Sequence, residues 1–114
     1  MANQRADFPN DARAVLTYQG QPAGSGTNTL VAAVAGKQIY VLSYCLQATG
    51  TTTAQFQDTT PANLSPAWTF QAREGVNRPA LANGALFATA PGAGLVLTLG
   101  AAVGVNVELQ YIIV

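Results

Sequence analysis

The chain contains no histidine, a single cysteine and only ten charged side chains among its 114 residues. A Ser–His–Asp triad requires an imidazole, and zinc centres use several His or Cys ligands, so both kinds of site are excluded. General acid–base catalysis needs titratable groups with shifted pKa values, and here few such groups exist. We therefore predict a protein that is not an enzyme and binds no cofactor or metal.

The few charges also restrict the partners. Five basic side chains balance five acidic ones, and they form no basic stripe of the kind that binds nucleic acid. No run approaches the ~20 apolar residues of a membrane helix, and the first residues lack the apolar run of a signal peptide. We expect synthesis in the cytoplasm, with neither nucleic acid nor membrane as a partner. A neutral chain has weak self-repulsion, which favours association.

Short β-type runs fill most of the chain. Apolar residues make up 49% of the sequence and recur in runs bounded by Gly, Pro and Asn. Short strands separated by such turn residues are typical of a sandwich or barrel, and no helical period persists, so we predict an all-β fold. The runs lie at 29–34, 38–48, 52–58, 67–72, 81–89, 95–99 and 103–114.

The last run alternates most clearly, and strand geometry places its apolar residues on one face, toward the core. That predicted core face consists of Val103, Val105, Val107, Leu109, Tyr111 and Ile113. The opposite face consists of Gly104, Asn106, Glu108 and Gln110.

Residues 38–48 carry apolar side chains at both odd and even positions, which predicts a strand covered on both sides. Cys45 lies in this run and has no disulfide partner in the chain, so we expect a small buried hydrophobe. The segment 49–51 predicts a hairpin-like turn into 52–58, and the charged stretch 73–79 predicts a loop.

Residues 1–26 are predicted to form an N-terminal arm and linker, and residues 27–114 the β-sandwich domain. Residues 21–26 are turn-rich, and residues 14–18 are compatible with a short strand or a docking segment. The charges and the Phe8-Pro9 pair favour a segment that orders on a partner, although an arm packed on its own or a neighbouring subunit is the alternative. The candidate contacts are Arg5, Asp7, Phe8, Asp11 and Arg13.

Trp68 is the aromatic side chain best placed to bind a sugar, because it lies beside a proline-bounded loop. Asn63 and Arg78 would be its polar neighbours. The alternative is that Trp68 belongs to the core, as we expect of most aromatic residues in this chain.

Charged residues of the domain have two interpretations. Arg73, Glu74 and Arg78 form either the polar rim of an interface or an ordinary solvated loop with salt bridges. Asp58, Glu74 and Glu108 are the acids of the domain, and we expect solvated charges rather than the paired carboxylates of a glycoside hydrolase.

Several segments together carry a resemblance: 32–44 with its Gly36-Lys37-x-Ile39-x-Val41 motif, 81–84, 94–99, and the closing Val-x-Val-x-Leu-x-Tyr strand. In these, residues 29–114 resemble small bacteriophage virion proteins of the capsid decoration (cement) and head-fibre type. The resemblance implies a jelly-roll-like antiparallel β-sandwich of about seven to eight strands, to which the chain adds an extended N-terminal arm. It also implies trimers on the virion surface, with the major capsid protein as partner and no catalysis.

Two functions are therefore in competition. The first is a capsid decoration protein that binds coat subunits and stabilises the shell. The alternative is a carbohydrate- or receptor-binding module of a phage fibre. A gene beside the major capsid gene would favour the first, and a gene beside tail genes the second.

Overall fold

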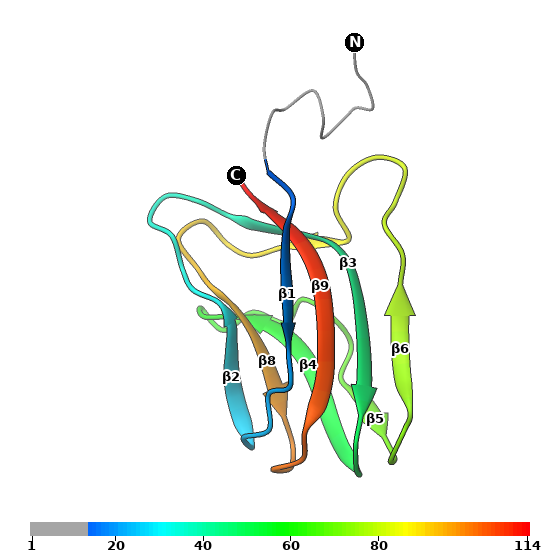
Figure 1. Ribbon diagram of the computed structural model, residues 1–114. Helices are drawn as coiled ribbons and strands as arrows, with labels where there is room; N and C mark the ends of the chain where they lie inside the picture. Colours follow the sequence, from blue (N-terminus) through cyan, green and yellow to red (C-terminus); the bar gives the residue numbers. More distant parts are fainter. Residues whose placement is uncertain (1–13) are drawn as a thin grey trace.

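The computed structural model describes residues 14–114 (Figure 1). The regular secondary structure in this range consists of β-strands alone, which confirms the all-β prediction. The strands are β1 (Leu16–Gly20), β2 (Gly26–Val31), β3 (Ile39–Ala48), β4 (Thr52–Asp58), β5 (Trp68–Phe70), β6 (Gly75–Arg78), β7 (Phe87–Ala88), β8 (Leu95–Leu99) and β9 (Val105–Ile113).

Two antiparallel sheets pack face to face as a sandwich. The larger sheet has the order β1-β9-β3-β6, with β7 also paired to β3, and the smaller sheet has the order β2-β8-β4-β5. Figure 1 shows β1, β9 and β3 in front of β2, β8 and β4. Among the described strands, β4 and β5 are the only consecutive pair that hydrogen-bond to each other. The turn 49–51 therefore crosses between sheets, and the hairpin predicted there is wrong.

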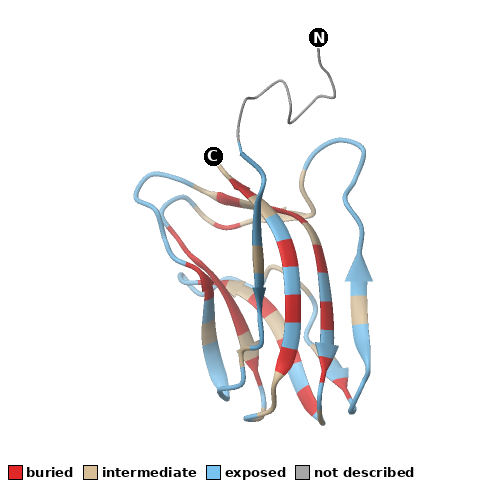
Figure 2. Cartoon of the chain, in the orientation of Figure 1, coloured by how far each residue is buried: buried red, intermediate tan, exposed pale blue. Residues whose placement is uncertain are grey.

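The core lies between the sheets and consists of the inward side chains of both. In β8, Leu95, Leu97 and Leu99 are at most 1% exposed, and Phe56 of β4 is fully buried. The ring of Phe56 lies 5.0 Å from that of Tyr44 and 5.3 Å from that of Phe87. Burying each such side chain stabilises the fold by roughly 1.5–3 kcal/mol. The alternation of buried and exposed residues along the front strands is visible in Figure 2.

The predicted alternation of the last strand holds over residues 105–110. Val105, Val107 and Leu109 are buried, whereas Asn106, Glu108 and Gln110 are exposed. Beyond Leu109 the pattern changes, because Ile112 is buried while Tyr111 and Ile113 are only half-buried. Val103 precedes the strand.

A β-bulge in β3 explains why residues 38–48 carry apolar side chains at both odd and even positions. Val41 pairs with Tyr111 and Ser43 with Gln110, so Leu42 is an extra residue in β3. After the bulge, alternate residues from Tyr44 onward point inward and those between them point out. The expectation of a strand covered on both sides is therefore wrong for this half, and so is that of a buried Cys45, which is exposed.

The N-terminal boundary of the sandwich also differs from the prediction. All five residues of β1 pair with β9, from Leu16 opposite Tyr111 to Gly20 opposite Val107. The sandwich thus begins before residue 27. Residues 14–18 were compatible with a short strand or a docking segment, and β1 shows that a strand begins there. A strand, β6, occupies part of the stretch 73–79 that was expected to be a loop.

Asp58, at the end of β4, is 1% exposed, which contradicts the expected solvated charge. Its carboxylate accepts hydrogen bonds from the backbone N–H groups of Thr60 (2.9 Å), Ala62 (2.8 Å) and Ala90 (3.1 Å), and from the Thr60 hydroxyl. Burial by itself raises the pKa of Asp58, but these hydrogen bonds outweigh it and lower the pKa to about 2. The side chain joins the loop after β4 to the segment after β7.

Candidate functional site

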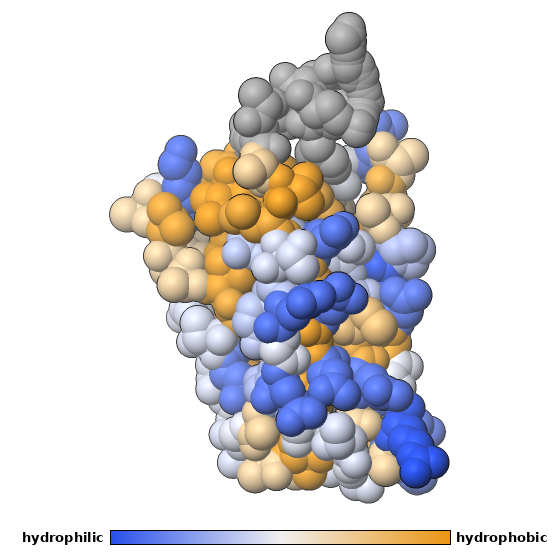
Figure 3. Space-filling model, viewed as in Figure 1, coloured by the Kyte–Doolittle hydropathy of each residue, from blue (hydrophilic) through white to orange (hydrophobic). Residues whose placement is uncertain are grey.

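The solvent-facing side of the larger sheet, here called the outer face, gathers polar side chains from four strands. One cross-strand row runs through Gln19 of β1, Glu108 of β9, Cys45 of β3 and Asn77 of β6, all exposed. A second row contains Thr17, Gln110 and Ser43. Figure 3 views this face, whose middle is polar and whose upper end is apolar. The rows follow from pairing, because directly opposed residues of neighbouring strands share a face.

Hydrogen bonds between neighbouring strands order the outer face. The amide nitrogen of Gln19 donates to a carboxylate oxygen of Glu108 (2.8 Å), and that of Gln21 donates to the Asn106 oxygen (2.7 Å). Glu108 is the single charged side chain of the two rows. The face is therefore rich in amides and poor in charge, and suits many short polar contacts rather than the binding of an ion.

Three shallow hollows of about 320 to 360 Å³ lie on this face, and Cys45 borders each of them. The first lies between β3, β9 and β6 and is lined by Ser43, Asn77, Pro79 and Glu108, among others. Ligand pockets usually enclose most of the ligand, and these hollows are open. Within residues 14–114, no three His, Cys, Asp or Glu side chains cluster as a metal site would require, and no helix is long and apolar enough to cross a membrane.

Sequence reasoning missed Cys45, Asn77 and Ser43 as members of this surface. The signal that was present is the alternation from Ser43 to Gln47, which begins after the bulge. Asn77 lay in a segment expected to be a loop, so its pairing with Cys45 could not be predicted.

Trp68 lies in β5, half-buried in an aromatic cluster rather than on an open loop. Its ring centroid is 5.8 Å from that of Tyr44, 6.1 Å from that of Phe56 and 6.2 Å from that of Phe70. The Asn63 oxygen accepts a hydrogen bond from the Gln57 amide (2.7 Å). Neither Trp68 nor Asn63 lines the three hollows.

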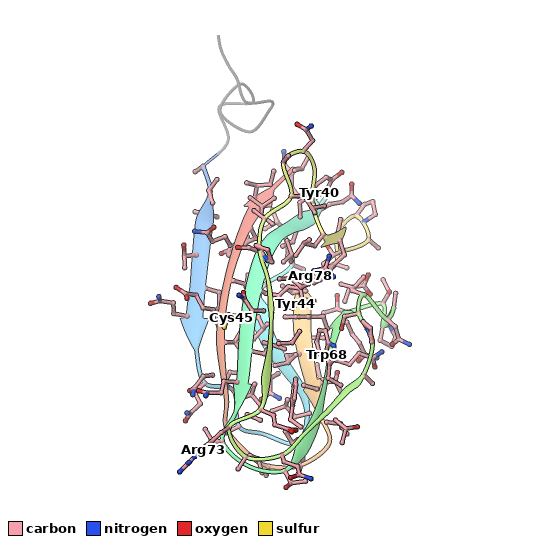
Figure 4. All side chains as sticks on the ribbon, turned by 90° about the vertical axis from the view of Figure 1, so that its right-hand side faces the viewer. Tyr40, Tyr44, Cys45, Trp68, Arg73 and Arg78 are labelled. Carbon is pink, nitrogen blue, oxygen red and sulfur yellow. The ribbon has the colours of Figure 1, made fainter. Side chains whose placement is uncertain are left out.

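The three charged candidates, Arg73, Glu74 and Arg78, lie in two different places. Arg73 lies in the turn between β5 and β6 with φ of 73°, and Figure 4 shows its side chain pointing away from the lower end of the sandwich. Glu74 closes the same turn, because its carboxylate accepts the backbone N–H of Gln71 (2.7 Å). Arg78 lies next to Tyr44: burial raises the pKa of Tyr44, and Arg78 opposes that rise. Arg73 and Arg78 also border hollows of the outer face, at its β6 edge.

The predicted arm contacts, Arg5, Asp7, Phe8, Asp11 and Arg13, lie outside the described residues. No known protein-family model matches the chain. A search of curated proteins also gives no significant match.

Proposed function

We propose that this chain is a structural virion protein that decorates a capsid, binding neighbouring coat subunits through the outer face and so stabilising the shell. The observation that carries the proposal is the outer face itself, an ordered, amide-rich sheet surface with Glu108 as the one charge of its two rows. Specific interfaces depend on several polar contacts and bridging waters, and they exclude unpaired charges from their centres.

The order of the strands supports the jelly-roll form of the sandwich. A five-stranded sheet, β1-β9-β3-β6 with β7 also paired to β3, faces the four-stranded sheet β2-β8-β4-β5. Successive strands change sheets except from β4 to β5 and from β6 to the short β7. Jelly rolls of this kind occur in viral capsid proteins, and fold alone does not establish function.

The N-terminal arm supplies a second contact in this proposal. Residues 1–13 precede β1 in the sequence, and β1 forms one edge of the outer face. Phe8 would provide an apolar anchor, and the charges around it would pair at the rim. Deleting residues 1–13 separates the contribution of this segment from that of the outer face.

A binding assay with charge variants tests the face. Asn77→Asp combined with Gln110→Glu places two new charges on the outer face, while Asn83→Asp makes the same kind of change in the exposed loop after β6. We expect the double variant to lose co-sedimentation with undecorated capsids and Asn83→Asp to retain it. Equal binding of all three proteins would remove the outer face from the function.

A glycan-binding fibre module is the second candidate, favoured by the polar lining of the hollow at Asn77 and Glu108. The described rows contain no exposed aromatic ring for a sugar to stack on. A glycan array followed by titration with Asn77→Asp tests this function. Glycan binding that the substitution abolishes, without capsid binding, would select it.

A further inference from the structure

We propose that the free edge of β1 pairs with β1 of a second copy of this chain, joining two larger sheets across a two-fold axis. The inference goes beyond capsid binding and does not depend on it. Among the strands of residues 14–114, β1 hydrogen-bonds to β9 on one side and to no strand on the other. Its outer backbone groups are therefore available for another strand.

The other three sheet edges carry features that natural proteins use to prevent such pairing. β2 begins at Gly26 and has an irregular register between Thr29 and Val31. β5 has three residues. β6 ends in Arg78 and is followed directly by Pro79. Bulges, very short strands, charges and proline all block edge pairing, whereas β1 has five regular residues and none of these.

The absence of charge around β1 favours a second copy as the partner. Residues 14–36, which include β1 and β2, contain no Asp, Glu, Lys or Arg, although Arg13 and Lys37 flank them. Close to a two-fold axis, a residue lies near its own copy, so a charge there meets a like charge. A different partner protein would impose no such restriction. The uncharged segment lies at the side of the sandwich where β1 and β2 form the two sheet edges.

Apolar exposure points to the same side. Of the four large hydrophobic side chains exposed in the described part of the chain, Val15 (47%), Leu16 (37%) and Val34 (38%) lie in this uncharged segment. Figure 3 shows apolar surface at the upper end of the outer face, where β1 begins. Association would remove part of this surface from water.

Two-fold symmetry together with pairing of all five residues of β1 sets the register. Antiparallel pairing centred on Tyr18 places Thr17 opposite Gln19 of the second copy, and Leu16 opposite its Gly20. Thr17 and Gln19 both lie on the outer face, so the polar rows of the two copies become continuous. This arrangement is a dimer, in place of the trimer that the resemblance implies.

A lysine placed on the edge tests the inference. Thr17→Lys puts a charge on β1, whereas Gln47→Lys makes the same charge change on β3 of the same face, away from the edge. By sedimentation equilibrium, we expect wild type and Gln47→Lys to form dimers, and Thr17→Lys to weaken the dimer by at least about tenfold. Both variants should melt within a few degrees of wild type, which separates loss of pairing from loss of folding.

Hydrogen exchange locates the interface independently. We expect β1 amides to become more protected as protein concentration rises, while β6 amides do not change. A monomer at all concentrations, a trimer, or a dimer that survives Thr17→Lys would each overturn the inference. Wild-type protein that co-sediments with capsids although it is a monomer at all concentrations would leave the proposed function intact, so the two proposals fail separately.

Discussion

Replacing Asp58 by asparagine tests the hydrogen-bonded network that joins the loop after β4 to the segment after β7. The asparagine oxygen still accepts from the N–H groups of Thr60 and Ala62. Its NH₂ group, however, faces the Ala90 N–H, which now donates to the carboxylate at 3.1 Å. One donor is left without an acceptor in a buried place, which costs about 1–3 kcal/mol.

The lost charge adds a second contribution. Lowering the pKa of Asp58 from 3.8 to about 2 corresponds to at most about 2.5 kcal/mol at neutral pH. Two loops rather than the deep core cover the carboxylate, so nearby solvent screens part of this stabilisation. We therefore assign about 1 kcal/mol to the lost charge. In total, Asp58→Asn should lower the free energy of unfolding by about 2–4 kcal/mol, or the melting temperature by roughly 8–16 °C.

The pH dependence gives the sharper measurement. Because the folded-state pKa lies below the unfolded one, the carboxylate stabilises the protein fully above pH 3.8, and this stabilisation is lost as the pH falls toward about 2. Chemical denaturation at pH 7 and pH 2.5 should therefore show a difference between wild type and Asp58→Asn that shrinks in acid. Glu108→Gln, an exposed acid-to-amide change, should cost less than about 0.5 kcal/mol. An Asp58→Asn protein as stable as wild type at pH 7 would refute the reasoning.

The burial of Val107, the exposure of Cys45 and the pairing of β1 each give a further prediction. Val107→Asp places an unpaired charge at a position that is 3% exposed, so it should abolish soluble folding; a melting temperature close to that of wild type would show that the register of β9 is wrong. Cys45→Ser should leave the melting temperature within about 2 °C, and the wild-type thiol should react with a maleimide without unfolding, since Cys45 is exposed. Deleting residues 1–13 should leave the sandwich folded but weaken capsid binding, whereas deleting residues 1–20 also removes β1 and should destabilise the fold; undiminished capsid binding by the shorter deletion would exclude the arm.

The strands with one apolar face could be predicted from the sequence because alternation records local geometry. Residues 52–58 and 95–99 were predicted with the observed bounds. The errors occurred where long-range pairing overrides the local pattern. The bulge at Leu42 places two buried residues in succession, which reads as a strand covered on both sides. Asp58 is an ordinary acid in the sequence and becomes a buried acceptor only when two loops, 32 residues apart, close over it.

The outer face, too, could be predicted only as far as the local pattern of each strand extends. Glu108 and Gln110 could be assigned to an exposed face from the alternation of their own strand, but their neighbours come from β1, β3 and β6, and no local pattern states which strands are adjacent. The lack of charge in residues 14–36 is visible in the sequence, where it has no particular meaning. It acquires one from the topology, because β1 and β2 are edge strands, where charged residues usually prevent association. A segment that lacks charge in the core needs no partner, whereas the same lack of charge along the regular edge strand β1 leaves that edge without the usual protection against pairing.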